Sequence, residues 1–472
     1  MIDVPVFIVG GGPAGLTASL LLSRQGIESL LVDKRSTDSP LPRARGFHAR
    51  AMEILRVTGV EPGMRAVELP ITPGVQWRGR LDGPPLRDTT LGPAIDNGLS
   101  PCEGLSVSQD VFESVLRDHA AAYSAARIER GVELESFDMS QDGVVAELGD
   151  GRQVRARWMI AADGARSGIR ERLGIAMDGP DDLGRQHMVA FRADLTAYTT
   201  ERPRGVYFLT DSHAALLWTH RDNRWVVSVP DSGQPVDEAA MVREVLGLPD
   251  LRVEVLAANR WTAAAQSATT YRSGPVFLIG DAAHRFPPAG ATGVSAAMHD
   301  AHNLAWKLAF VARGQADESL LGTYAVERQA VGQRNVAETA GAWARMFGGS
   351  AEVFAERSLA QIDMGYQYRS AAVESDGVDA DPPGADYKPS ATPGCRAPHM
   401  WIELDGTKVS TIDLFEREIV LLTTPLGESW RFAHPEAKSV VIHEPEWPAL
   451  YGISPEGAVM VRPDGHVAWR KR

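Results

Sequence analysis

The hydrophobic pattern at the start of the 472-residue chain changes from strand to helix and back to strand. Residues 4–9 form a continuous apolar run, which is typical of a parallel strand covered on both faces. Apolar residues at helical spacing follow from Leu16, and residues 27–32 form a second apolar run. The pattern therefore predicts a strand, a tight turn, a helix and a second strand, the start of a Rossmann-type α/β fold.

Further along the chain, the spacing of hydrophobic residues predicts more helices and strands. Helices are expected over residues 48–57, 109–126, 295–312 and 318–347, with Ser108 as the cap of the second. Turn residues Asp142-Gly143 and Asp150-Gly151 predict hairpins. Residues 177–270 alternate as in an antiparallel sheet, and residues 275–281 again indicate a buried parallel strand.

Composition narrows the classes of partner. Hydrophobic residues make up 44% and charged residues 23% of the chain, as in globular proteins. The net charge is −13 and no basic block occurs, so neither nucleic acids nor anionic membranes are expected as partners. We find no signal-peptide pattern and no apolar run long enough to cross a bilayer, and therefore expect a cytoplasmic protein. Cys102 and Cys395 form no CxxC pair, and no histidine or carboxylate spacing predicts a metal site.

A glycine-rich motif follows the first expected strand. In GGGPAG, Gly10 allows a tight turn, Gly12 lets a pyrophosphate come close, and Gly15 lets helix and strand pack tightly. The helix start offers unpaired N–H groups to phosphate. Asp33 follows at the end of the second strand, where a carboxylate can accept the ribose hydroxyls. The combination predicts dinucleotide binding.

Two more aspartates end apolar strands. Asp163-Gly164 follows the strand that begins near Arg157, and Gly280-Asp281 follows the strand of residues 275–281. Ligands gather at the carboxyl edge of an open α/β sheet, where both aspartates should lie. Asp281 can bond a sugar-alcohol hydroxyl such as those of a ribityl chain, which favours FAD over NAD.

With these motifs in place, residues 1–345 resemble the class A flavoprotein monooxygenases of the para-hydroxybenzoate hydroxylase fold. The resemblance is carried by GGGPAG, DGARSGIR and GDAAHRFPPAGATG, followed by DAHNLAWKLA and by Tyr324 with Glu327-Arg328. PGCRAPHMW, STIDLF and VRPDGHVAWR resemble the thioredoxin-like tail of phenol hydroxylases and aromatic polyketide hydroxylases.

The resemblance implies a Rossmann-type FAD-binding domain with an inserted, mainly antiparallel substrate domain and a thioredoxin-like C-terminal domain. The FAD-binding domain would comprise residues 1–70, 101–176 and 272–373, the last including long helices. The substrate domain would comprise residues 71–100 and 177–271. A linker of residues 374–392 would lead to the C-terminal domain of residues 393–472.

It also implies the cofactor site. The expected FAD-binding residues are Gly10, Gly12, Pro13, Ala14, Gly15, Asp33, Lys34, Arg35, Arg45, Gln109, Asp163, Gly164, Gly280, Asp281, Pro288, Gly290, Ala291, Thr292, Gly293 and Val294. The helix that begins near Val294 would stabilise the negative charge of the reduced flavin at the pyrimidine edge of its ring. No second GxGxxG occurs, so NADPH or NADH would dock only transiently.

The implied reaction is hydroxylation of a phenolic or polycyclic, polyketide-type substrate with O2, through a flavin 4a-hydroperoxide, in bacterial secondary metabolism. Baeyer–Villiger oxygenation or epoxidation on the same scaffold is the alternative, and a non-catalytic flavin-binding module is a third. Residue type suggests a substrate pocket of Trp77, Phe191, Tyr207, Trp218, Trp225 and Pro287. No catalytic base is identified, His284 is expected to be structural, and the sequence leaves a homo-oligomer open.

Overall fold

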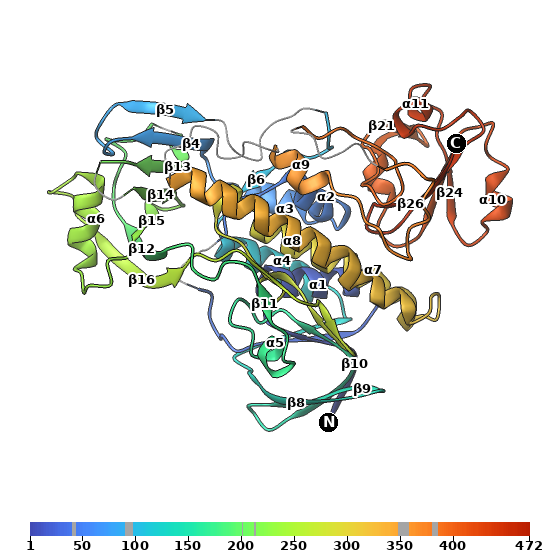
Figure 1. Cartoon of the computed structure of the whole chain (residues 1–472), viewed down its shortest axis with the longest axis horizontal. Coiled ribbons are helices and arrows are strands. Elements are labelled where there is room, and N and C mark those ends of the chain that lie inside the picture. The colour runs from blue at the N-terminus through green and yellow to red at the C-terminus, as the bar shows by residue number, and fades with distance from the viewer. Residues whose placement is uncertain (40–43, 90–97, 201, 212–213, 348–357, 380–385) are drawn as a thin grey trace.

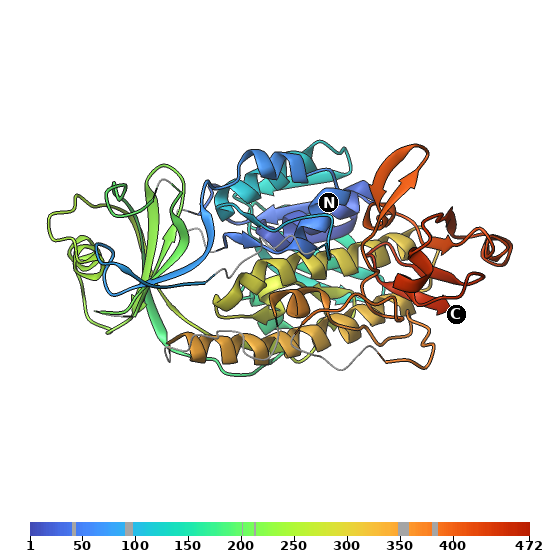
Figure 2. The ribbon, with the colours of Figure 1, turned by 90° about the horizontal axis from the view of Figure 1, so that it is seen from above.

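The computed structural model describes residues 1–39, 44–89, 98–200, 202–211, 214–347, 358–379 and 386–472. Three sheet-containing parts follow one another along the long axis of the molecule (Figures 1 and 2). The first sheet and the long helices lie in the middle. A second sheet lies at one end and the C-terminal part at the other.

The first sheet has eight strands. Its parallel strands are, in spatial order, β19 (Val276–Leu278), β10 (Gln153–Ala161), β1 (Ile2–Val9), β2 (Ser29–Asp33) and β7 (Ala126–Arg130). Antiparallel strands complete it: β18 (Arg272–Ser273) pairs with β19, β9 (Gly143–Leu148) with β10, and β8 (Leu134–Ser140) with β9. The hairpins predicted at Asp142-Gly143 and Asp150-Gly151 are confirmed.

The longest helices of this part pack against one another beside the sheet: α1 (Pro13–Arg24) against α4 (Gln109–Ala121) and α7 (Thr292–Ala312), and α7 against α8 (Ser319–Phe347). The shorter helices are α2 (Ala49–Val57), α3 (Glu61–Ala66), α5 (Gly168–Arg172) and α9 (Leu359–Met364). The prediction that α4 continues to residue 126 was wrong, because Ala126 already belongs to β7. Ser108 precedes α4 but makes no side-chain capping bond within the described chain. Its Oγ lies 2.7 Å from Nδ1 of His220 instead.

The second sheet has seven strands and is mainly antiparallel. Its order is β16 (Glu254–Thr262), β12 (Arg185–Arg192), β15 (Arg224–Pro230), β14 (Ala215–Thr219), β13 (Arg204–Leu209), β4 (Thr72–Arg78) and β5 (Pro85–Thr89). Side chains alternate between its two faces. One face forms a hydrophobic core with residues of α6 (Glu238–Leu246), and the other carries Met188, Leu216 and Val226.

Short strands connect these parts. β11 (Met177–Asp178), β17 (Gln266–Ala268) and β20 (His284–Arg285) form one small sheet, and β3 (Gly46–Phe47) pairs with β6 (Leu105–Ser106). The C-terminal part has a four-stranded sheet in the order β24 (Lys438–Val441), β23 (Val420–Thr423), β25 (Ala458–Val461) and β26 (Val467–Lys471). It also contains the hairpin β21 (Trp401–Leu404) and β22 (Thr407–Ser410), with helices α10 (Trp430–Ala433) and α11 (Trp447–Tyr451). No helix in the described ranges is long and apolar enough to cross a membrane.

A buried ionic network joins the C-terminal part to the long helices. Glu327 of α8 accepts hydrogen bonds from Arg462 at 2.6 and 2.9 Å and from Lys307 of α7 at 2.7 Å. Arg396 pairs with Glu53 of α2, and Arg50 donates to the Asp464 carbonyl at 2.5 Å. Buried charges are stable only when they are paired and hydrogen-bonded. The C-terminal part is therefore docked by specific charge pairs.

Candidate active site

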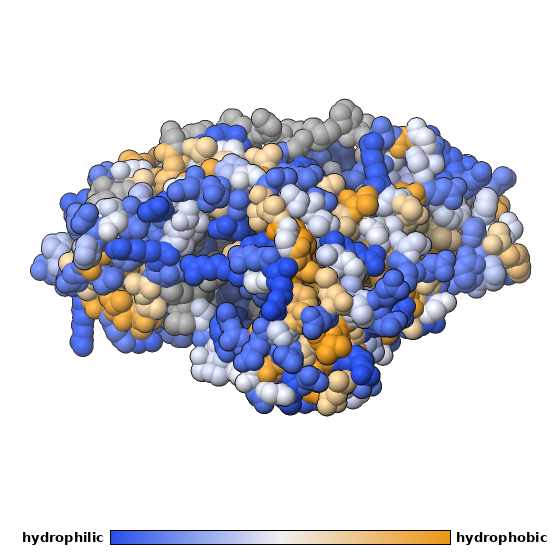
Figure 3. All heavy atoms as spheres, turned by 60° about the horizontal axis from the view of Figure 1, so that its bottom comes forward, coloured by the Kyte–Doolittle hydropathy of each residue, from blue (hydrophilic) through white to orange (hydrophobic). Residues whose placement is uncertain are grey.

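A cavity of about 1370 Å³ lies between the carboxyl edge of the first sheet, the second sheet and the loop before α7. On the face drawn in Figure 3 the molecule is hollowed, and hydrophilic residues surround much of the recess. The cavity wall includes these predicted cofactor residues: Gly10, Gly12, Pro13, Ala14, Asp33, Lys34, Arg35, Arg45, Gln109, Asp163, Gly164, Asp281, Pro288, Gly290, Ala291, Gly293 and Val294. The tertiary structure therefore brings together residues spread over 285 positions of the chain (10–294).

The glycines of the first motif have separate structural roles. Gly10 has φ +112°, and a Cβ there would lie 2.2 Å from the Ala162 carbonyl oxygen. A Cβ at Gly15 would lie 2.0 Å from the Gly10 carbonyl oxygen, so Gly15 serves packing and lies outside the cavity wall. Gly12 is the N-cap of α1 and carries no capping side chain, so the first N–H groups of the helix remain available to an anion.

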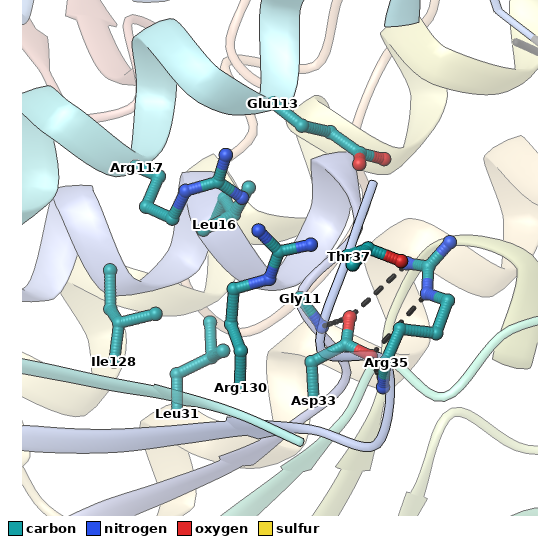
Figure 4. A pocket seen from close by; sticks show the side chains of 10 residues that line it. All are labelled: Gly11, Leu16, Leu31, Asp33, Arg35, Thr37, Glu113, Arg117, Ile128 and Arg130. Atoms are coloured by element: carbon teal, nitrogen blue, oxygen red, sulfur yellow. Dashed lines mark hydrogen bonds and ion pairs between the residues drawn. The ribbon is translucent and has the colours of Figure 1, made fainter. Parts of the chain in front are cut away.

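Asp33 lies at the end of β2 and bonds the glycine turn that follows β1. Its Oδ2 accepts from the Gly11 N–H at 2.8 Å, and its Oδ1 accepts from the Arg35 N–H at 2.8 Å. Burial raises the pKa of this carboxyl, but the hydrogen bonds from Arg35 and Gly11 outweigh burial and lower it. Figure 4 shows Asp33 between Gly11 and Arg35 in a small pocket beside the main cavity, with Glu113 above them. Asp33 is therefore held as an ionised acceptor.

Arg45 and Gln109 also lie in the cavity wall. Arg45 donates to the carbonyl of Gly205 and, at 3.0 Å, to that of Thr219, both on the second sheet. Its burial lowers the pKa of the guanidinium to about 10. Gln109 accepts from the Ala44 N–H at 2.9 Å. Both side chains thus stand where the two sheets approach each other, and their contact with the FAD phosphates stays a prediction.

The other two aspartates lie at the carboxyl edge of the first sheet. Asp163 follows β10, accepts from the Ile169 N–H at 3.2 Å, and has a buried Oδ1 without a partner among the described residues. Its burial raises the pKa of the carboxyl. Asp281 follows β19 and is exposed to the cavity. Gly280 is a packing residue outside the wall, since a Cβ there would meet that of Ala14 at 2.9 Å.

The loop before α7 forms the far wall of the cavity. Gly290 and Ala291 both adopt left-handed backbone conformations, with φ of +78° and +56°. Ala291 is the N-cap of α7 and has no capping side-chain oxygen. Thr292 lies outside the wall, and its buried Oγ1 has no partner among the described residues. The start of α7 therefore presents N–H groups near the cavity.

The structure corrects four of the six predicted substrate-pocket residues. Phe191, Tyr207 and Trp225 lie in the hydrophobic core on the α6 face of the second sheet. Trp77 belongs to a separate buried cluster, with the Arg87 guanidinium 3.8 Å from its ring centroid. The prediction was wrong for these four. For the first three, residue type does not show which face of a strand turns towards a cavity. Trp77 packs in one cluster with Leu216 and Trp218 of the wall but lies outside the wall itself. Trp218 and Pro287 do line the cavity.

Sequence reasoning missed several residues of the wall. His48, His220, Phe286 and Trp261 line the cavity, as do Arg166, Arg172, Arg260 and Arg285. The signals for Arg166 and Phe286 were present, since they lie inside the DGARSGIR and GDAAHRFPPAGATG motifs. His220 is buried beside Arg45 and Arg224, and its burial and these charges lower its pKa to about 3, so its ring is neutral.

His284 has a partner that the sequence did not reveal. Its Nε2 lies 2.7 Å from Oδ2 of Asp300 on α7, which also accepts from the Gly280 N–H at 3.0 Å. The Arg328 guanidinium donates to the other oxygen of Asp300 at 2.7 Å. His284 is almost fully buried. These contacts agree with a structural role in fixing β20 and the Gly280 turn against α7 and α8.

The cavity fits FAD in chemistry and in size. One end has an uncapped helix start and an ionised carboxylate, which suit a pyrophosphate and a ribose. Asp281 and the left-handed turn at Gly290 lie further along the wall, near a second uncapped helix start. Pockets for drug-sized ligands are about 300–1000 Å³, so this larger cavity has room for a dinucleotide and a second molecule. The fold and site define a dinucleotide-binding flavoprotein.

Comparison with known proteins agrees with a flavin-binding site. The FAD binding domain family matches residues 3–339, and the C-terminal domain of aromatic-ring hydroxylases matches residues 390–472. Tetracenomycin A2 monooxygenase-dioxygenase of Streptomyces glaucescens is 36% identical, over 99% of this chain and 93% of its own. Aklavinone 12-hydroxylase of Streptomyces peucetius is 37% identical, over 91% and 93%.

Solved structures show the same architecture. A ternary complex of aklavinone-11 hydroxylase with FAD and aklavinone has a TM-score of 0.92 and 33% identity, covering 100% of this chain and 96% of that one. The flavin-dependent monooxygenase PieE, solved with FAD and substrate, has a TM-score of 0.91 and 30% identity over the same shares. The chain belongs to the FAD-dependent aromatic-ring hydroxylases. It is a monooxygenase that uses FAD, and NAD(P)H is the typical co-substrate of its family.

Proposed function

We propose that the protein hydroxylates a polycyclic phenol of the aromatic polyketide type, with NADPH as reductant and O2 as oxidant. The observation that carries the proposal is the large cavity shared by the cofactor motifs and one apolar face of the second sheet. Relatives named for tetracenomycin A2 and aklavinone support this substrate class. Gly12 and Asp33 would hold the ADP half of FAD, and Gly290 and Ala291 would hold its ring.

The domain assignment follows from the same placement. Residues 1–70, 101–176 and 272–373 form the FAD-binding domain, and residues 71–100 and 177–271 form the substrate domain. Membership of β4 and β5 in the second sheet supports the first substrate segment. Residues 374–392 connect to a thioredoxin-like domain of residues 393–472, of which the four-stranded sheet is the centre. Residues 380–385 of this connection lie outside the described residues.

The substrate side of the cavity is mostly apolar. The second sheet contributes Met188, Leu216, Trp218, Val226 and Trp261 to the wall. A flat polycyclic ring system buries a large apolar area against such a surface, at about 25 cal/mol per Å². Asn259 also lines the cavity and is exposed to it, so its amide can bond a phenol or ketone oxygen of the substrate.

The residues of this chain position the reactants and exclude water. When bound, FAD supplies the electron transfer from NADPH and the activation of O2. The first turns of α1 and α7 place N–H groups where negative charge lies on the pyrophosphate and on the reduced flavin. Apolar residues such as Trp218 and Phe286 keep water from the reacting ring. No residue of this chain is assigned as a general base.

The direct test follows NADPH and NADH oxidation by the FAD-loaded protein with tetracyclic phenols, and with a monocyclic phenol as a size control. We expect faster NADPH oxidation only with the tetracyclic compounds, and a product heavier by one oxygen with its ring system intact. A ring-expanded lactone as the product would show that the reaction is Baeyer–Villiger oxygenation and not hydroxylation. Failure of the protein to hold FAD would overturn the proposal.

Replacing Trp218 by alanine tests the substrate side. Trp218 lies in the cavity wall, so we expect KM for the tetracyclic substrate to rise about tenfold, roughly 1.4 kcal/mol of lost apolar contact, with FAD content unchanged. Trp401→Ala is the matched control, because that ring is 42% exposed on β21 and lies outside the cavity wall. Steady-state kinetics measure both; equal KM values would show that the substrate does not lie against this face.

A further inference from the structure

His48 lies in the cavity wall between β3 and α2, and both of its ring nitrogens face acceptors. Its Nε2 lies 2.8 Å from the carbonyl oxygen of Gly290 in the loop before α7. Its Nδ1 lies 3.5 Å from Oδ1 of Asp363 on α9. The Gly290 carbonyl can only accept, so Nε2 carries a proton. Nδ1 makes no hydrogen bond among the described residues, but it lies at ion-pair distance from a carboxylate, which favours a second proton there.

The surroundings favour this doubly protonated ring. Burial lowers the pKa of His48, but the contacts with Asp363 and Gly290 outweigh burial and raise it. Asp363 is itself held as a carboxylate, since its Oδ2 accepts from the Arg50 N–H at 3.2 Å. His299 of α7 lies 3.7 Å from Asp363, but its burial lowers its pKa far below the usual value and leaves it neutral.

Further cations among the described residues lie near this group. The Arg334 guanidinium donates to the Ile362 carbonyl, next to Asp363. Two others have anionic partners. The Arg50 guanidinium is 2.8 Å from Glu53, and the Arg328 guanidinium is 2.7 Å from Asp300. His48 is therefore the cation that the Asp363 carboxylate pairs with directly.

The loop that His48 contacts has a costly backbone conformation. Ala291 is left-handed, a conformation in which the Cβ of an L-residue comes too close to the following carbonyl oxygen. Such a turn persists only where its surroundings hold it. The His48 ring bonds the Gly290 carbonyl, and the His48 N–H donates to Ser295 Oγ at 3.4 Å. Gly46 packs against Ala291, because a Cβ added to Gly46 would lie 3.2 Å from the methyl group of Ala291. The segment of residues 46–48 thus holds the turn.

We propose that His48 and Asp363 form a positioning pair that fixes the Gly290–Ala291 turn and keeps a positive imidazolium beside the flavin ring, which makes reduction of the bound flavin easier. The proposal rests on the flavin placement given under the proposed function. Reduction adds negative charge to the ring, and a nearby cation in a buried site stabilises that charge. The residues act through position and charge, and no bond to either is made or broken.

The first measurement uses the FAD-loaded wild-type protein, and a variant serves only to assign the signal. Nitrogen chemical shifts of 15N-labelled histidines, with His48 assigned by comparison with His48→Gln, report the protonation of each ring. We expect two protonated nitrogens on His48 at pH 7. A neutral His48 ring at pH 7 would overturn the proposal.

The second measurement is the midpoint potential of bound FAD. His48→Gln keeps a donor for Gly290 but removes the charge, and Asp363→Asn removes the carboxylate that holds it. We expect both to shift the potential to more negative values, and Asp363→Glu to restore it towards the wild-type value. His434→Gln is the matched control, because its ring also faces a carboxylate, Glu436 at 3.3 Å, but lies outside the cavity wall.

The outcomes separate this inference from the proposed function. An unchanged potential in His48→Gln and Asp363→Asn, with FAD bound, would overturn the positioning pair alone. Absence of FAD from the wild-type protein would overturn the proposed function and the inference with it. A shift of similar size in His434→Gln would also count against the pair, since that residue has no route to the flavin.

Discussion

Gly12→Ala is expected to weaken FAD binding by roughly 100-fold, about 2.7 kcal/mol, without unfolding the protein. A Cβ at Gly12 would lie 4.0 Å from the nearest described atom, Oε1 of Glu113, so the apo-protein accommodates it. The methyl group would occupy the space that the pyrophosphate needs at the start of α1. Flavin fluorescence titration gives the affinity, and denaturant unfolding of the apo-protein gives the stability.

Two other glycines provide the comparison. Gly10→Ala should lose both stability and FAD, because its Cβ would lie 2.2 Å from the Ala162 carbonyl oxygen at a φ of +112°. Gly322→Ala, within α8 and outside the cavity wall, should leave FAD affinity unchanged. Wild-type affinity in Gly12→Ala would contradict the placement of the pyrophosphate at this turn.

Glu327→Ala is expected to lower the free energy of unfolding by about 3–5 kcal/mol, because it leaves the buried Lys307 without its carboxylate and Arg462 with Asp464 alone. The Glu327 carboxylate is fully buried and is shared by Arg462, Lys307 and the Asn303 amide, which donates at 2.7 Å. Two of these partners lie on α7 and one lies in the C-terminal part. The variant should therefore loosen the docking of that part, which limited proteolysis and denaturant unfolding would detect.

Glu318→Ala is the matched control for this charge. Glu318 pairs with Arg157 at 2.9 Å just before α8, but the carboxylate is 52% exposed, and exposed pairs contribute only about 0–1 kcal/mol. Equal losses of unfolding free energy in Glu327→Ala and Glu318→Ala would show that the buried network does not hold the C-terminal part.

The Glu327 carboxylate also makes the free energy of unfolding depend on pH. Burial raises the pKa of Glu327, but Arg462 and Lys307 outweigh burial and hold it far below its usual value of 4.5. A carboxyl with a lowered folded-state pKa binds fewer protons when folded, so its contribution is complete above about pH 4.5 and is lost as the pH falls. Between neutral and acid pH, the free energy of unfolding of Glu327→Gln should therefore fall by less than that of the wild-type protein.

The dinucleotide-binding unit could be predicted from the sequence, because its parts are adjacent in the chain. The strand ending at Val9, the turn at Gly10 and the helix from Pro13 are consecutive, and each has a local signal in period or residue type. Asp33 belongs to the next strand of the same unit. The family motifs around Asp163 and Asp281 were likewise read from short segments, and comparison with relatives confirmed the family that they indicated.

The side chains that share the cavity could be identified from the folded structure alone. Trp225 pairs across the strands with Thr219, next to Trp218, so the two tryptophans point to opposite faces. Both faces of this sheet are apolar, one against α6 and one towards the cavity, so alternation alone could not assign either ring. His48 and Asp363 are 315 residues apart, and Glu327 and Arg462 are 135 apart. Such pairs depend on how whole elements pack, and no local period carries that information.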